Sequence, residues 1–214
     1  MNRANRERQG TDDDRDLGRL NALSDGVFAI AITLLVLNIE VPEVPPSRVA
    51  QELPNQLIGL APAFLSYVIS FFVIGAYWMA HRAVFRGIKS LDRRLIWLNI
   101  VFLMFVAFLP FPTNLLDEYP NDRLTVVIYA GSLAIARLPL TAIWWYASRD
   151  RRLVHDDIDS SEIRLHRIRG LGIPLVFLVS IGISFISVRA AMFSWVLLFV
   201  VDSLILREVR PRQG

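Results

Sequence analysis

The stretch that decides the fold is RLNALSDGVFAIAITLLVLNIEVP, Arg19 to Pro42, in which a polar start runs into a long apolar segment. The apolar part can cross a membrane, because about 20 helical residues at about 1.5 Å each span a hydrocarbon core of about 30 Å. The stretch nevertheless places Ser24 and Asp25 among apolar neighbours. A carboxylate is costly inside a bilayer, so Asp25 requires a structural or functional explanation.

The composition of the whole chain is that of a membrane protein. Hydrophobic residues make up 54% of the 214 residues and charged residues 20%, and the mean hydropathy is +0.43. Because the charged residues gather in short clusters between long apolar runs, we predict an all-α integral membrane bundle. Its six predicted transmembrane helices are Leu20–Val41, Leu57–Ala80, Leu95–Leu116, Leu124–Tyr146, Leu171–Val188 and Ala190–Leu206. The last two are predicted to form a tight hairpin, since about 35 residues are too long for one crossing.

The uneven distribution of Lys and Arg predicts the orientation. Nineteen of these residues lie in the two terminal segments, in residues 81–94 and in residues 147–170. The alternate loops hold only Arg48, Arg123 and Arg189. Both termini are therefore predicted to face the cytoplasm. No nucleic-acid partner is expected, because the basic residues line one membrane face without aromatic residues between them.

These boundaries predict one domain with short polar ends. The six-helix domain covers residues 19–206, and residues 1–18, which include TDDDRD, are expected to be a disordered cytoplasmic tail. Residues 148–169 are expected to be a cytoplasmic loop with a short amphipathic helix from about Ser161. Residues 207–214 would form a cytoplasmic C-terminal tail.

The sequence contains little that suggests an enzyme. It has no cysteine, which excludes disulfides, thiolate metal ligands and cysteine nucleophiles. Common metal, hydrolase and phosphate-loop motifs are absent, and so is the Thr-Val-Gly-Tyr-Gly segment of carbonyl-lined potassium filters. His155, Asp156 and Asp157 could bind a metal, but a charged loop is the simpler interpretation. We therefore expect no enzyme activity, no cofactor and no metal site.

Several ionisable or polar residues interrupt the apolar runs, namely Asp25, His81, Asn99, Arg137 and Asp202. Such residues usually face a bundle interior or a water-filled path. The first three lie at similar depth near the cytoplasmic ends of the first three runs. Arg137 lies nearer the middle of the membrane and could pair with Asp202 or with a carbonyl.

The three residues at similar depth predict a buried polar cluster. Arg19 or His81 would offset the charge of Asp25, while Ser24 and Asn99 would supply hydrogen bonds. The cluster could be a structural lock between three helices, or it could handle ions or protons directly. The residues alone leave both interpretations open.

The second half of the first apolar run carries an apolar stripe. Thr33 is the only polar residue between Val27 and Leu37. Ile30, Leu34 and Leu37 follow at i, i+4 and i+7, which is one face of a helix. On spacing alone, this stripe would face lipid or pack in the bundle core.

The same stretch resembles a known family. Arg19 followed by Leu23, Ser24 and Asp25 is similar to the Arg-x-x-x-Phe-Ser-Asp motif of the transmembrane protein 175 family, the endosomal and lysosomal potassium channels and their prokaryotic relatives. YWMAHRAVFRGI and DRRLIWLNIVFLMFVAFLPFPTNLL resemble the second and third helices of prokaryotic members. Leu23 replaces the motif's Phe, so similar packing should survive while ring stacking is lost.

The resemblance implies an assembly and a path for ions. Prokaryotic members have a single repeat and form homotetramers, in which the first helix of each subunit lines the pore. Ile30, Leu34 and Leu37 match the family's hydrophobic constriction, and Thr33 matches a polar layer proposed to favour potassium. The chain is thus expected in the prokaryotic cell membrane, among lipids, with potassium as the permeant ion.

The resemblance also gives the polar cluster a role. Arg19, Ser24 and Asp25 would hold the cytoplasmic end of the pore helix against the next two helices, through partners such as His81 and Asn99. The ring of apolar side chains could then dewet and block ions when it is narrow.

Other functions remain open from the sequence. A secondary transporter would use broken helices, for which Pro62, Pro139 and Pro174 are candidate positions. A proton-permeable channel and a non-conducting membrane scaffold are the further alternatives.

Overall fold

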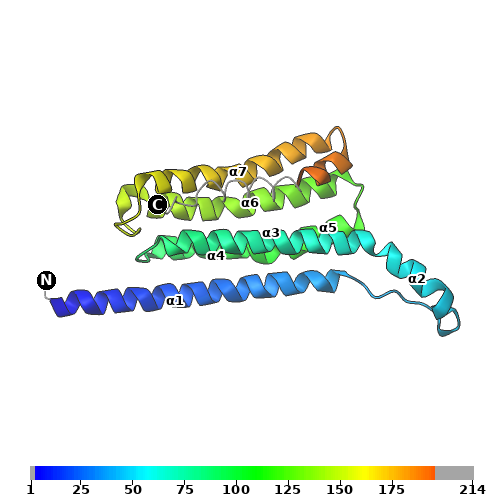
Figure 1. The fold of residues 1–214 in the computed structure, drawn as a ribbon, viewed down its shortest axis with the longest axis horizontal. Helices are drawn as coiled ribbons and strands as arrows, with labels where there is room; N and C mark the ends of the chain where they lie inside the picture. The colour runs from blue at the N-terminus through cyan, green and yellow to red at the C-terminus, as the bar shows by residue number, and fades with distance from the viewer. Residues whose placement is uncertain (1–2, 196–214) are drawn as a thin grey trace, which may run out of the picture.

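The structure is a computed structural model that describes residues 3–195. Its helices run lengthwise along one elongated bundle, with α1 on one side and α6 and α7 on the other (Figure 1). In chain order the elements are α1 (Arg3–Leu34), η1 (Leu35–Asn38), η2 (Pro46–Arg48), α2 (Val49–Gly59), α3 (Ala61–Arg86), α4 (Arg93–Phe108), α5 (Pro110–Glu118), α6 (Arg123–Ala147), η3 (Arg149–Arg151) and α7 (Ser160–Ser184).

The described residues hold five segments that are long and apolar enough to cross a membrane. They are Asp13–Asn38, Ala61–Arg86, Arg93–Glu118, Arg123–Ala147 and Ile163–Ser184, which correspond to the first five predicted spans.

The start of the predicted sixth span folds back along α7. The chain turns after α7 and is helical again over 188–195. Trp195 Nε1 donates a hydrogen bond to Ser180 Oγ at 2.6 Å, so this segment returns beside α7. The remainder of the sixth span and the predicted tail 207–214 lie outside the described residues.

Three boundaries differ from the sequence prediction. Residues 3–18, expected to be disordered, belong to α1, because no proline interrupts this segment and extending a helix costs less than nucleating one. The amphipathic helix expected from Ser161 is continuous with the fifth span in α7. No proline separates the two parts, because the first proline of α7 is Pro174, which already lies inside the span. The third predicted span consists of two helices, because Pro110 has no backbone N–H and begins a new one.

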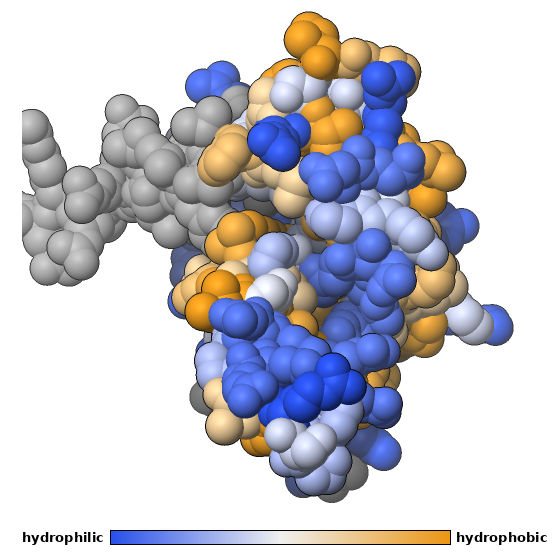
Figure 2. All heavy atoms as spheres, turned by 90° about the vertical axis from the view of Figure 1, so that its right-hand side faces the viewer, coloured by the Kyte–Doolittle hydropathy of each residue, from blue (hydrophilic) through white to orange (hydrophobic). Residues whose placement is uncertain are grey.

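The surface of the bundle is divided between its ends and its sides. Figure 2 shows the end that carries α2, where hydrophilic residues gather across the face and hydrophobic residues lie at its edges. Large apolar side chains are exposed on the helices, among them Phe72, Met79, Trp97 and Met104. This is the surface of an integral membrane protein, with apolar sides available to lipid or to partner subunits.

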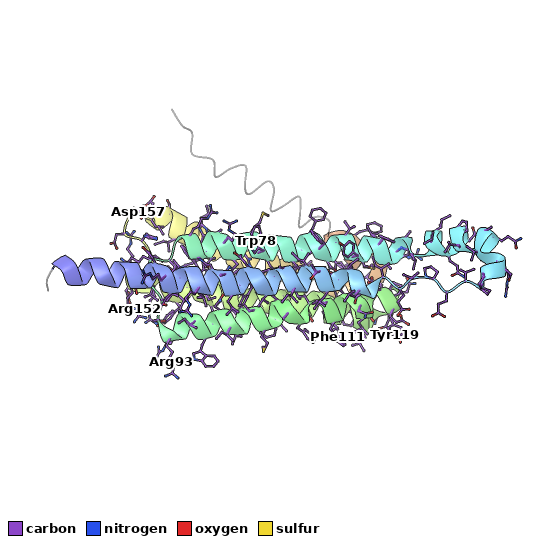
Figure 3. The ribbon with its side chains drawn as sticks, turned by 90° about the horizontal axis from the view of Figure 1, so that it is seen from below. Trp78, Arg93, Phe111, Tyr119, Arg152 and Asp157 are labelled. Carbon is purple, nitrogen blue, oxygen red and sulfur yellow. The ribbon has the colours of Figure 1, made fainter. Side chains whose placement is uncertain are left out.

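At the opposite end, a cluster of three side chains joins two loops. Asp92 Oδ1 caps α4 by accepting the Leu95 N–H at 2.9 Å, and Asp92 Oδ2 accepts hydrogen bonds from Tyr146 and, at 2.9 Å, from Arg152. Burial raises the pKa of Asp92, but these hydrogen bonds and the Arg152 charge outweigh that effect and hold the pKa below its ordinary value. Arg152 is labelled at this end in Figure 3. We call Asp92, Tyr146 and Arg152 the loop clasp.

Candidate functional site

One face of α1 packs against its own chain. Leu20, Ser24, Phe28, Ala31 and Leu35 are all buried, and they recur every three or four residues. The first four lie in α1 and Leu35 is the first residue of η1, and this spacing places all five on one side. We call these five residues the inner seam.

A second face of α1, roughly 110° around the helix from the inner seam, carries the predicted constriction. Ile30 is 60% exposed, Leu34 40% and Leu37 71%. Leu37 lies in η1, just past the end of α1, where Asn38 Nδ2 donates to the Pro110 carbonyl at 3.4 Å. We call Ile30, Leu34 and Leu37 the apolar stripe; the described part of the chain leaves this stripe largely uncovered.

Thr33, the predicted selectivity residue, lies on the exposed side beside the stripe. Its Oγ1 is 3.0 Å from the Ala29 carbonyl oxygen and 2.9 Å from the Ile30 carbonyl oxygen. A hydroxyl has one hydrogen, and here that hydrogen is donated back into the helix. The lone pairs of Oγ1 are therefore free to accept from water or to contact a cation.

Three of the predicted network residues form one buried chain of hydrogen bonds. Ser24 Oγ donates to the Leu20 carbonyl at 2.9 Å, Asn99 Nδ2 donates to Ser24 Oγ at 3.1 Å, and Asn99 Oδ1 lies 2.9 Å from His81 Nε2. Because Asn99 Oδ1 can only accept, His81 Nε2 carries a hydrogen and donates it. These hydrogen bonds join α3, α4 and α1, and each one donates in the same direction, from His81 through Asn99 and Ser24 to the Leu20 carbonyl.

Aromatic rings hold the His81 imidazole in this position. Phe85 and Phe102 stack on it with ring centroids at 4.3 Å and 5.5 Å, and Phe28 of the inner seam meets it edge-on at 5.9 Å. His81 is therefore a packed part of the interior as well as a hydrogen-bonding group.

Asp25 takes a partner that the sequence prediction did not name. Trp78 Nε1 donates to Asp25 Oδ1 at 2.7 Å, and the Arg82 guanidinium lies 4.9 Å from the centre of a Trp78 ring. Asp25 follows Ser24 by one residue, which turns it about 100° away from the inner seam, so it does not join the Asn99 chain. Within the described residues, Arg19 forms no ion pair with Asp25. An interfacial indole N–H needs an acceptor, and this requirement could have pointed to Trp78.

A second polar network, absent from the prediction, lies toward the α2 end of the bundle. Ser70 Oγ and the Tyr129 hydroxyl are 3.0 Å apart, and Thr113 Oγ1 donates to Ser70 Oγ at 3.1 Å. Tyr77 donates to the Leu133 carbonyl at 2.7 Å. Ser, Thr and Tyr are too common in membrane helices for their sequence positions to have marked this site.

Arg137 and Asp156, two charged residues noted in the sequence, each contact another side chain of the bundle. Arg137 is buried with its guanidinium 5.8 Å from the Tyr77 ring, and its suggested partner Asp202 lies outside the described residues. Asp156 binds Lys89 Nζ at 2.8 Å, and this hydrogen bond and charge hold the pKa of Asp156 below its ordinary value. Within residues 3–195, no group of three or more His, Cys, Asp or Glu residues could hold a metal ion.

Comparison with known proteins places the chain among ion channels and not among enzymes. The family described as "Endosomal/lysosomal potassium channel TMEM175" matches residues 19–110. The chain is 38% identical over 179 residues to a potassium channel of Streptomyces collinus, covering 79% of this chain and 83% of that one. It is 34% identical over 135 residues to the endosomal/lysosomal proton channel TMEM175 of Mus musculus, covering 59% of this chain and 27% of that one.

A solved structure agrees with the fold. The crystal structure of a lysosomal potassium-selective channel TMEM175 homologue from Chamaesiphon minutus superposes with a TM-score of 0.77 at 34% identity, covering 89% of this chain and 97% of that one. The matched residues include the inner seam, the apolar stripe and the His81 network. By sequence and by fold alike, the chain belongs to the TMEM175 family of ion channels.

Proposed function

We propose that this chain forms a homotetrameric, potassium-preferring cation channel in which α1 lines the ion path. The observation that carries the proposal is the contrast across α1, where the inner seam is buried in its own subunit while Ile30, Leu34 and Leu37 are exposed. A symmetric ring of four chains would turn this one-sided stripe into a closed constriction. The potassium-channel relatives support the choice of ion.

In this proposal the path has an apolar gate with a polar layer beside it. Branched side chains of the apolar stripe would exclude water and ions when the ring is narrow. Thr33 would offer one hydroxyl oxygen per subunit to a dehydrating cation, because its hydrogen is already donated to the helix. Ser24, Asn99 and His81 would hold the helices at a fixed spacing, with both termini in the cytoplasm.

Cysteine crosslinking tests the proposed axis. The chain has no native cysteine, so Leu34→Cys should give disulfide-linked subunit dimers on oxidation. Phe28→Cys is the matched control, because Phe28 is 2% exposed within its own subunit and should not crosslink. Crosslinking at Phe28 but not at Leu34 would overturn the pore-facing assignment.

Ion flux tests the proposed gate. Ile30→Asn keeps the number of side-chain heavy atoms but offers hydrogen bonds to water, so potassium flux into proteoliposomes should rise and potassium preference should weaken. Ile100→Asn places the same change on an exposed position of α4 and should not raise the flux. Equal flux from both variants would argue against α1 as the lining helix.

Proton permeation is a second candidate, because the mouse relative is named a proton channel. A pH-sensitive dye inside the same vesicles would detect it. Proton entry that persists without potassium flux, and that Ile30→Asn does not change, would assign the protons a different path. The secondary-transporter alternative receives less support, since Pro139 and Pro174 lie inside the continuous helices α6 and α7.

A further inference from the structure

A cavity of about 300 Å³ opens between α1 and α3 at the loop-clasp end of the bundle. Its wall includes Asn21 and Asp25 from α1, Arg82 and Arg86 from α3, and His155 from the loop before α7. This volume is at the lower end of the range for small-molecule sites. The charged side chains on its wall are of mixed sign, so the balance between them decides what it could hold.

The two arginines are available to a ligand. Arg82 and Arg86 stand one helical turn apart on α3, and neither forms an ion pair within residues 3–195. The Arg82 guanidinium lies 4.9 Å from the centre of a Trp78 ring, which limits its freedom before any ligand arrives. The opposing carboxylate, Asp25, already accepts the Trp78 N–H at 2.7 Å.

The wall contributed by the loop is also fixed in place. The backbone N–H of His155 donates to the Gly87 carbonyl at 3.1 Å, and Lys89 Nζ binds the carboxylate of the neighbouring Asp156 at 2.8 Å. A side chain at position 87 would collide with Trp144, whose ring carbon lies 2.8 Å from where a Cβ would stand. Ile158 of the loop lies 3.2 Å from the same position, so Gly87 lets both α6 and the loop pack closely on the end of α3, where His155 lines the cavity with the two arginines.

We propose that this cavity binds a phosphate group, supplied by an anionic lipid headgroup or by a soluble phosphate ester. The guanidinium groups of Arg82 and Arg86 outnumber the single carboxylate of Asp25, so the wall of the cavity carries a net positive charge. A guanidinium group can also donate two parallel hydrogen bonds to the oxygens of one phosphate. Basic pockets between helices at the cytoplasmic side of a membrane bind anionic headgroups. The cytoplasmic placement rests on the orientation proposed above, whereas the binding measurement is independent of orientation and of ion conduction.

The test uses full-length protein in neutral detergent with two probes. One probe is short-chain phosphatidylglycerol, compared with phosphatidylcholine of the same chain length, and the other is glycerol 3-phosphate. Binding is read from the thermal unfolding midpoint as each probe is titrated. Phosphatidylglycerol should raise the midpoint of the wild-type protein more than phosphatidylcholine does, and a matching response to glycerol 3-phosphate would identify a soluble ester as the source.

Charge-removing variants locate the binding. Arg82→Gln combined with Arg86→Gln should weaken binding about tenfold or more, since each arginine supplies charge-assisted hydrogen bonds. Arg149→Gln removes the same charge from an exposed loop position outside the cavity and should bind as the wild-type protein does. If the double variant fails to assemble, Arg86→Gln alone should still show a clear loss. Equal weakening by Arg149→Gln, unchanged binding by the cavity variants, or no binding of either probe would each overturn the proposal.

Discussion

The two sides of α1 are built from similar residue types but meet different surroundings. The inner seam and the apolar stripe are both largely apolar, yet the seam is buried in its own chain while Ile30 and Leu37 are more than half exposed. The seam also contains Ser24, whose hydroxyl joins the Asn99 and His81 chain. The seam therefore fixes the position of α1 in the bundle, whereas residues 3–195 leave the stripe largely uncovered.

The largest expected effect is a difference in the free energy of unfolding between a substitution in the inner seam and one in the apolar stripe. Phe28→Ala removes a buried ring that meets both His81 and Phe102, and it should lower the free energy of unfolding by about 3–5 kcal/mol. Leu34→Ala should cost far less stability and should increase ion leak instead. Thermal unfolding together with vesicle flux measures both, and a Leu34→Ala loss equal to that of Phe28→Ala would remove the distinction.

A second expected effect tests the polar part of the seam. Asn99→Ala leaves the His81 Nε2–H without its acceptor, while the Ser24 hydroxyl keeps its bond to the Leu20 carbonyl. One unpaired buried donor costs about 1–3 kcal/mol. Met104→Ala, an exposed change on the same helix, is the control. A similar drop in unfolding temperature for both variants would show that the network contributes no stability.

A substitution in the loop clasp should change stability at a site that belongs neither to the inner seam nor to the apolar stripe. Because the pKa of Asp92 is held below its ordinary value, its contribution is present at neutral pH and is lost as the pH falls through that lowered pKa, below about 4. Asp92→Asn keeps an oxygen that can accept the Leu95 N–H but removes the charge that Arg152 and Tyr146 bind, so it should cost about 1 kcal/mol or less at pH 7. The free energy of unfolding of Asp92→Asn should also fall less steeply than that of the wild-type protein as the pH is lowered from 6 to 3, which unfolding measurements over this range can show. Potassium flux at pH 7 should not change, since the clasp does not touch the stripe.

The seam illustrates what could be predicted from the sequence and what could not. The five spans, and the meeting of Ser24, Asn99 and His81, followed from apolar length and from similar depth in the membrane. The Trp78 partner of Asp25 did not follow, because one residue along a helix turns a side chain by about 100° and depth alone does not give that rotation. The hydroxyl network of Ser70, Thr113 and Tyr129 depends on how three helices pack, which no local pattern specifies.

In the proposed tetramer, the role of the stripe and its neighbour Thr33 would depend on contacts between subunits, so it remains a prediction. The smallest expected effect lies here. Thr33→Val keeps the branched shape and removes the hydroxyl, so the apolar gate should persist and stability should change little. The potassium-to-sodium permeability ratio should nevertheless drift toward one, because the lone pairs of Thr33 Oγ1, which the hydrogen bond to the helix leaves free, are lost.

Thr33→Ser is the matched control for that last prediction, since it keeps the hydroxyl and removes only the methyl group. Reversal potentials under bi-ionic potassium and sodium conditions should therefore stay near the wild-type value for Thr33→Ser and shift for Thr33→Val. A tenfold change in the permeability ratio corresponds to about 1.4 kcal/mol, and one weak oxygen contact per subunit should give less than that. If the two variants shift equally, side-chain shape and not the hydroxyl sets the ion preference. If neither shifts, the selectivity-determining contacts lie away from this face of α1.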